Sequence, residues 1–253
     1  MKPLELAEVT AYVEEHIRAF HDARLESLEQ VRLKTILLRK NPYLFKAKNV
    51  LTASDLVRGF LDAHLSSQEE TIFGGFLERL AIFVCERVFQ GQKSSAEGID
   101  LEFTRDGKRF IVAIKSGPNW GNSQQIMRMR DNFLRAKRTL HTNSLASNVI
   151  AVNGCCYGKD DRPDKGDYLK LCGQRFWEFV SGDADLYLKI IEPLGHKARE
   201  RNDAFQTAYA RIINQFTLGF SEEFCRDGFI DWEKLLRFNS AAGSADGDFE
   251  AAA

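Results

Sequence analysis

Apolar residues recur at intervals of three and four along the first third of the chain, which is the spacing of amphipathic helices. The pattern predicts a helix over residues 4–40, a segment without glycine. The sequence Lys40-Asn41-Pro42 should end this helix. A short helix over 54–64 follows. The capping-box spacing of Ser67-Gln68-Glu69-Glu70 predicts a third helix, from there to about Val88. The first third should therefore be mostly helical.

The pattern changes at Gly98, after which β-type residues dominate. Two such runs, 99–103 and 110–114, flank Asp106-Gly107, the strongest short signal for a two-residue type I′ hairpin turn. With these two residues as the turn, apolar side chains pair on one face, the expected core face: Phe103 with Phe110, Leu101 with Val112, and Ile99 with Ile114. The opposite face then carries Asp100, Glu102, Ile111, Ala113 and Lys115.

Shorter elements follow the hairpin. Gly117-Pro118-Asn119 ends the second strand, and Ser123 caps a predicted helix over 124–140. The remaining predicted elements are a strand over 148–153, a loop over 155–173, and helices over 174–181, 196–216 and 231–237. This order predicts an α/β fold, with a mixed β-sheet flanked by helices and a helical N-terminal arm.

Composition places the chain among globular proteins. Apolar residues make up 44% and charged residues 28%, and the net charge is -1. No uncharged apolar run reaches the ~18 residues that a membrane-spanning helix needs. Acidic residues stand in the first segment where a signal peptide would be apolar. We therefore expect a cytoplasmic protein without a membrane partner.

The five cysteines fit a reducing compartment, because their number is odd and no export signal is present. Cys155, Cys156 and Cys172 lie close in sequence but lack the paired spacing of a zinc site. Structural thiols are the main interpretation, and a metal site at these residues is the alternative.

The polar face of the hairpin suits hydrolysis of a phosphodiester. The carboxylates of Asp100 and Glu102 could hold Mg²⁺ through oxygen ligands, and the metal would activate water and polarise the phosphate. Lys115 could orient that water and offset phosphate charge. The alternative is a solvated hairpin face with an ordinary cross-strand ion pair.

The residues that follow resemble a known family. Asp100, a strand, a turn, and a second strand ending in Ile114-Lys115 before a helix resemble the PD-(D/E)XK nuclease motif. The run IKSGPNWGN looks like a signature of a subset of type II restriction endonucleases, and VNGCCYGK and DYLKLCGQRFWEF look like the same group. The resemblance covers roughly residues 40–240. It implies a restriction-endonuclease-like fold, an Mg²⁺-dependent endodeoxyribonuclease, and a role in a restriction-modification system.

The motif is incomplete at one position. The family has an acid two residues before the lysine, and this chain has Ala113 there. Glu102 is the leading replacement, because it shares a face with Asp100. Glu78 is the second candidate, because the helix before the first strand often supplies an acid in the family; the alternative is a surface acid. The family geometry also implies that the carbonyl of Ile114 reaches the metal.

Charge is unevenly distributed along the chain. Residues 105–138 hold nine Lys and Arg against two Asp, which leaves a charge of +7 around the candidate site. Such a patch suits binding to the phosphates of double-stranded DNA. The candidate DNA-binding residues are Asn119, Asn122, Ser123, Gln124, Gln125, Arg128 and Lys159. Helix capping and a solvated loop are the alternatives for these residues.

Three functions remain open from the sequence. The first is a type II restriction endonuclease that cuts a palindromic site as a homodimer. The second is a repair or recombination nuclease of the same fold, and the third is a sequence-specific DNA-binding protein that has lost cleavage with the acid at Ala113. The predicted organisation is a helical arm at 1–66, which either forms the dimer contact or packs on its own domain, a nuclease domain at 67–239, and a disordered tail at 240–253.

Overall fold

The computed structural model describes residues 2–143 and 148–242, with the side chains of 141–143 left aside. Within that part of the chain, one compact unit combines the residues up to Asp22 with Glu70–Arg199, and a second combines Ala23–Glu69 with the residues from Glu200 onward. The arm predicted at 1–66 therefore contributes to both units. From residue 243 the predicted tail lies outside the described residues.

The first unit contains a five-stranded mixed sheet in the order β1-β2-β3-β4-β5. The strands are β1 (Gln92–Lys93), β2 (Leu101–Arg105), β3 (Lys108–Lys115), β4 (Val149–Cys155) and β5 (Leu169–Cys172). The pairs β1–β2 and β2–β3 are antiparallel, and β3–β4 and β4–β5 are parallel. The predicted α/β fold, with a mixed sheet flanked by helices, is confirmed.

The hairpin prediction is confirmed in its turn and in most of its register. Asp106 and Gly107 both have positive φ, 52° and 72°, as a type I′ turn requires. Leu101 pairs with Val112 and Phe103 with Phe110, and these side chains lie in the main core of this unit. That core also contains residues from α1 (Leu6–Glu29), α4 (Ala53–Phe89) and α6 (Gln174–Ser181).

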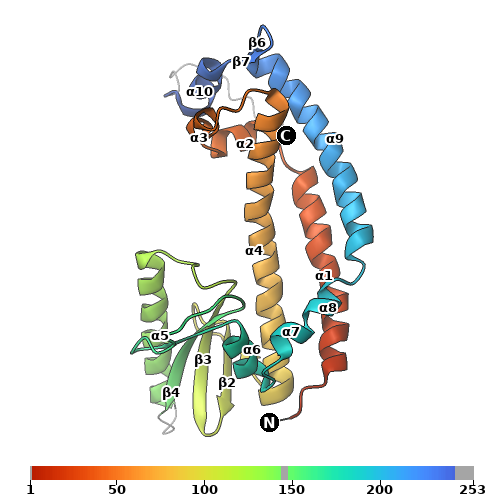
Figure 1. Cartoon of the computed structure of the whole chain (residues 1–253). Coiled ribbons are helices and arrows are strands. Elements are labelled where there is room, and N and C mark those ends of the chain that lie inside the picture. Colours follow the sequence, from red (N-terminus) through yellow and green to blue (C-terminus); the bar gives the residue numbers. More distant parts are fainter. Residues whose placement is uncertain (1, 144–147, 243–253) are drawn as a thin grey trace. The chain divides into compact units, whose positions relative to one another are not determined.

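The opposite face of the hairpin is covered, which corrects the expectation for Ile111 and Ala113. Both are buried against Met129 and Phe133 of α5 (Ser123–Asn143), which lies along that side of the sheet (Figure 1). The parallel pair β3–β4 requires a crossover connection, and α5 is that connection. Ile99 was also misplaced: it packs with Ile111 in this second cluster, because regular pairing begins only at Leu101.

Two helix predictions in the first third of the chain were wrong, and the helix expected to end at residue 216 continues to Phe224. The helix expected over 4–40 is divided into α1 and α2 (Leu33–Arg39). The helices expected over 54–64 and 67–88 form the single helix α4, in which the Ser67 hydroxyl donates to the carbonyl of Ala63 within the helix. A serine that bonds back to the preceding turn does not act as a cap, so the helix continues.

The second unit is built from helices and one short hairpin. It contains the second part of α1, α2, α3 (Pro42–Ala47), the first part of α4, α9 (Ala198–Phe224), α10 (Trp232–Ser240), and the β6–β7 hairpin (Cys225–Arg226 and Phe229–Ile230). Leu28, Leu37, Phe60 and Phe220 lie in its core. The short helices α7 (Leu186–Lys189) and α8 (Ile191–Leu194), which were not predicted, belong to the first unit. No helix in the described ranges is long and apolar enough to cross a membrane.

Candidate active site

Asp100 lies at the entrance to β2 and is fixed to the end of β3. Its Oδ2 accepts a hydrogen bond of 2.7 Å from the backbone N–H of Ile114, the residue before Lys115. Burial raises the pKa of the Asp100 carboxyl, whereas the Ile114 N–H, Lys115 and Lys93 act to lower it. The folded chain therefore holds a partly desolvated carboxylate beside two ammonium groups.

Glu78 of α4 belongs to the same electrostatic cluster. Its pKa is raised by burial first and by the negative charge of Asp100 second, and Lys93 and Lys115 act in the opposite direction. Glu78 comes from α4, whose second part packs on the sheet. Two carboxylates with raised pKa values beside lysines are the arrangement expected at a functional site.

Lys115 contacts the ring of Trp120, which is itself hydrogen-bonded to the buried side chain of Asn153. Its Nζ lies 5.2 Å from the centroid of the Trp120 ring, within range of a cation–π contact. The Trp120 indole N–H donates to Oδ1 of Asn153 at 3.1 Å, and Nδ2 of Asn153 donates to the carbonyl of Ala113 at 3.1 Å. Asn153 is 1% exposed, so it links β4, β3 and the turn that carries Trp120 from inside the protein.

Glu102 has different partners. Its carboxylate accepts a hydrogen bond from Gln92 Nε2 at 2.9 Å and forms an ion pair with Arg109 at 3.3 Å. These contacts connect Glu102 with the neighbouring strands β1 and β3, and the largest effects on the pKa values of Asp100 and Glu78 come from other groups. The structure therefore brings Glu78 into the cluster of Asp100 and Lys115. The carboxylate of Glu102 instead contacts Gln92 and Arg109.

Lys93 is a member of the cluster that sequence reasoning missed. It lies in β1, and its charge acts on both Asp100 and Glu78. A strand of two residues has too little periodicity to be recognised in the sequence. The pairing of Lys93 with Leu101 places it at the same end of the sheet as Asp100.

Two of the polar residues at the start of α5, Asn122 and Gln125, cap the helix. Asn122 Oδ1 accepts from the backbone N–H of Gln125, and Gln125 Oε1 accepts from the backbone N–H of Asn122, both at 3.0 Å. This reciprocal pair is a capping box. The other candidates for DNA contact are exposed at the surface: Asn119, Ser123, Gln124, Arg128 and Lys159.

In the folded chain, part of the positive charge of the basic segment, residues 105–138, is balanced by acidic side chains. Acidic residues from outside residues 105–138 pair with its arginines. Glu97 pairs with Arg128 and Arg135, Glu102 with Arg109, and Asp167 with Arg130. The two pairs of Glu97 are exposed and weak, so a phosphate that approaches can compete for the guanidinium groups of Arg128 and Arg135. The pairs of Glu102 and Asp167 are partly buried.

The cysteines have the character of structural thiols. Cys155 and Cys172 are partners across β4 and β5, and Cys156 is also buried. Burial raises the pKa of all three thiols, that of Cys156 to about 12, so they are protonated near neutral pH. Across the described residues, no group of three or more His, Cys, Asp or Glu side chains is placed to hold a metal.

The raised pKa of Glu78 predicts a stability cost. A carboxyl that holds its proton more tightly in the folded chain loses folding stability as the pH rises above its ordinary pKa. We expect Glu78→Gln, without added metal, to melt at a higher temperature than the parent at neutral pH. The difference should vanish in acid, where Glu78 is protonated in both states. Thermal melts followed by circular dichroism across that pH range measure the effect.

Glu86→Gln is the matched control, because Glu86 is an exposed acid on the same helix. Its melting temperature should follow that of the parent at every pH. A lower melting temperature for Glu78→Gln at neutral pH would show that Glu78 makes a stabilising contact, and would contradict the assignment of a desolvated functional carboxylate.

The mixed sheet flanked by helices is consistent with the restriction-endonuclease class of fold. Residues 7–202 match the family model described as type II restriction endonuclease EcoO109I. That match covers more than half of the chain, and the protein belongs to this family. A comparison with the curated proteins finds no match.

Proposed function

We propose that this protein is a type II restriction endonuclease that hydrolyses double-stranded DNA at a specific palindromic site and requires Mg²⁺. The observation that carries the proposal is the cluster of Asp100, Glu78 and Lys115, contributed in the first unit by the residue before β2, by α4 and by the end of β3. Family membership supports nuclease activity on DNA. The role within a restriction-modification system belongs to the same proposal.

The donor atoms of the cluster fit a magnesium ion. Mg²⁺ prefers oxygen ligands, is commonly bound by one or two carboxylates, and keeps several waters. Asp100 and Glu78 would hold the ion, with the Ile114 carbonyl as a third ligand implied by the family geometry. A divalent cation would also lower the raised pKa values of both carboxyls. When bound, Mg²⁺ supplies a water of lowered pKa and a positive charge at the phosphate.

The other side chains of the cluster would position the attacking water and balance charge on the phosphate. Lys115, steadied by Trp120, would orient the attacking water and balance the charge that develops on the phosphate. Asp100, fixed by the Ile114 N–H, would keep its carboxylate aimed at one position. Lys93 adds a second positive charge for the phosphate. Glu102 stays a candidate that would have to leave Arg109 to take part.

DNA contacts are proposed on the surface around the cluster. Asn119, Ser123 and Gln124 are exposed at the turn before α5 and in its first residues, where backbone N–H groups favour phosphate and side chains can reach base edges. Arg128 and Lys159 would contact phosphates. Asn122 and Gln125 would act through the capping box, by fixing the first turn of α5.

A homodimer is part of the proposal, because symmetric cutting of a palindrome requires two sites related by a twofold axis. The second unit has large apolar side chains at its surface: Leu38, Tyr43, Leu44, Leu51, Leu218 and Phe229. Exposed apolar patches are typical of association surfaces. Sedimentation of the purified chain tests this part, and a monomer at micromolar concentration would contradict it.

Digestion of a plasmid of known sequence with Mg²⁺ tests the function as a whole. We expect discrete bands whose sequenced ends share one palindromic motif. A ladder, or cuts restricted to branched DNA, would favour a repair or recombination nuclease. Binding to one sequence without any cleavage would favour the third function, in which Ala113 marks lost catalysis.

A further inference from the structure

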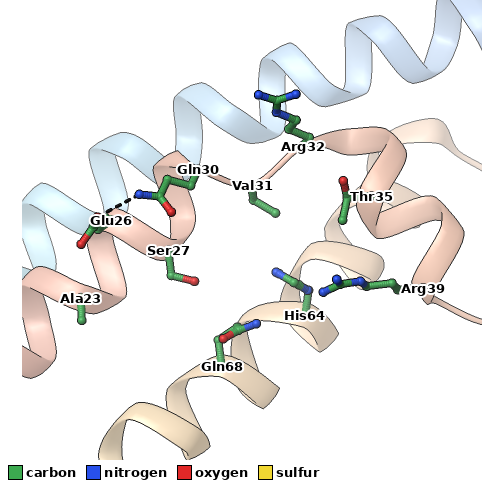
Figure 2. Close-up of a pocket in the computed structure, with 10 residues that line it drawn as sticks. All are labelled: Ala23, Glu26, Ser27, Gln30, Val31, Arg32, Thr35, Arg39, His64 and Gln68. Atoms are coloured by element: carbon green, nitrogen blue, oxygen red, sulfur yellow. Dashed lines mark hydrogen bonds between the residues drawn. The ribbon is translucent and has the colours of Figure 1, made fainter. Parts of the chain in front are cut away.

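A polar cavity of about 680 Å³ lies in the second unit, bordered by α1, α2 and α4 (Figure 2). Ten residues line it: Ala23, Glu26, Ser27, Gln30, Val31, Arg32, Thr35, Arg39, His64 and Gln68. All of them belong to the helical unit, whereas Asp100, Glu78 and Lys115 belong to the other unit. The cavity is therefore separate from the nuclease cluster.

Positive charge gathers at one end of this cavity. The side chains of Arg39 and His64 point toward one another there (Figure 2). Lys40 adds a further charge, because its Nζ donates to the carbonyl of Ala63 at 2.8 Å, next to His64 in the chain. Within the described part of the chain, neither Arg32 nor Arg39 has an ion-pair partner.

The acidic group of the cavity does not neutralise that end. Glu26 is the one acid among the ten lining residues, and its carboxylate accepts a hydrogen bond of 2.8 Å from Gln30 Nε2 (Figure 2). The pKa of His64 is lowered by burial first, then by the charge of Lys40 and then by that of Arg39. The site thus carries a positive potential that a bound anion would offset.

We infer that this end of the cavity binds a phosphate group, with the Arg39 guanidinium as its charged contact and the His64 ring as a second hydrogen-bond donor. A guanidinium presents paired donors that match the oxygens of a phosphate. The phosphate could belong to a DNA backbone or to a small phosphorylated compound, since the chemistry is the same. This inference goes beyond the proposed cleavage reaction and does not depend on it.

Titration of the His64 ring by NMR in the full-length protein tests the inference. Inorganic sulfate is the first probe, because it is tetrahedral like phosphate and keeps its charge throughout the titration. We expect saturating sulfate to raise the pKa of His64 by about one unit, as an opposite charge at contact distance does. By linkage, sulfate should bind roughly tenfold more tightly when His64 is protonated. His64→Gln identifies the signal among the five histidines.

Matched variants separate a site from general screening. Arg39→Gln should raise the pKa of His64 in the free protein and remove most of its response to sulfate. Arg237→Gln, an exposed arginine of the same unit that pairs with Glu233, should leave both unchanged. The inference is overturned if chloride at equal ionic strength has the same effect as sulfate, or if Arg39→Gln responds as the parent does. Circular dichroism checks that each variant is folded.

Two further arms identify the source of the phosphate. In Ca²⁺, a blunt DNA duplex at micromolar concentration should shift the His64 signal if the backbone occupies the site. A shift with millimolar inorganic phosphate but not with the duplex assigns the site to a small molecule. Both outcomes support the inference, and no shift with either probe overturns it. Plasmid digestion tests the nuclease activity separately. A failure of the phosphate inference would therefore leave the proposed nuclease function intact, and a failure to cleave DNA would leave the phosphate inference intact.

Discussion

Replacing Asp100 with asparagine is expected to reduce the rate of DNA cleavage in Mg²⁺ by at least about 10²–10³-fold, the loss typical of removing one preorganised electrostatic contact. Asparagine has nearly the same shape, and its Oδ1 can still accept from the Ile114 N–H. The substitution therefore removes the charge and keeps the local fold. Single-turnover cleavage of a duplex that contains the recognition site measures the change.

The control lies in the same hairpin. Asp106→Asn removes an exposed carboxylate from the turn, where asparagine tolerates the positive φ. Its cleavage rate should match that of the parent. Binding of the Asp100→Asn protein to the same duplex in Ca²⁺ should also match, because the DNA contacts are elsewhere. Cleavage at the parental rate by Asp100→Asn would show that Asp100 does not hold the metal.

The part of the site that sequence revealed is the part built from local signals. The Asp106-Gly107 turn fixes the hairpin register through backbone geometry alone, and this register places Asp100 near the end of β3. Alternation along the hairpin then identifies Leu101, Phe103, Phe110 and Val112 as core. Each of these inferences involves residues within one short segment.

The parts that sequence missed depend on contacts between distant segments. Ile111 and Ala113 are buried because α5 crosses over them, and no pattern inside the hairpin records that crossover. Glu78 was only the second candidate, behind Glu102, because a helical acid looks the same in sequence whether it faces solvent or a second carboxylate. Its charge acts together with that of Asp100 because α4 packs on the sheet. The boundary at Ser67 failed because tertiary packing sustains one long helix through a capping signal.

Glu78 and Glu102 can be distinguished by matched glutamine variants. We expect Glu78→Gln to lose about 10²-fold or more in cleavage rate, because its charge acts in the cluster of Asp100 and Lys115. Glu102→Gln should stay within a few-fold of the parent, since it loses a partly exposed ion pair with Arg109 that contributes little. Rates measured over a range of Mg²⁺ concentrations report the effect directly.

Metal and pH dependence make this comparison specific to the site. Glu78→Gln should need a higher Mg²⁺ concentration for half-maximal cleavage, whereas Glu102→Gln should not. In the parent, cleavage should rise with pH through the raised pKa values of Asp100 and Glu78, because both must lose a proton to bind the metal. Glu78→Gln should retain only the Asp100 part of that rise. If Glu102→Gln instead shows the higher metal requirement, then Glu102 replaces the acid that is missing at Ala113, and its contact with Arg109 must open when DNA and metal bind.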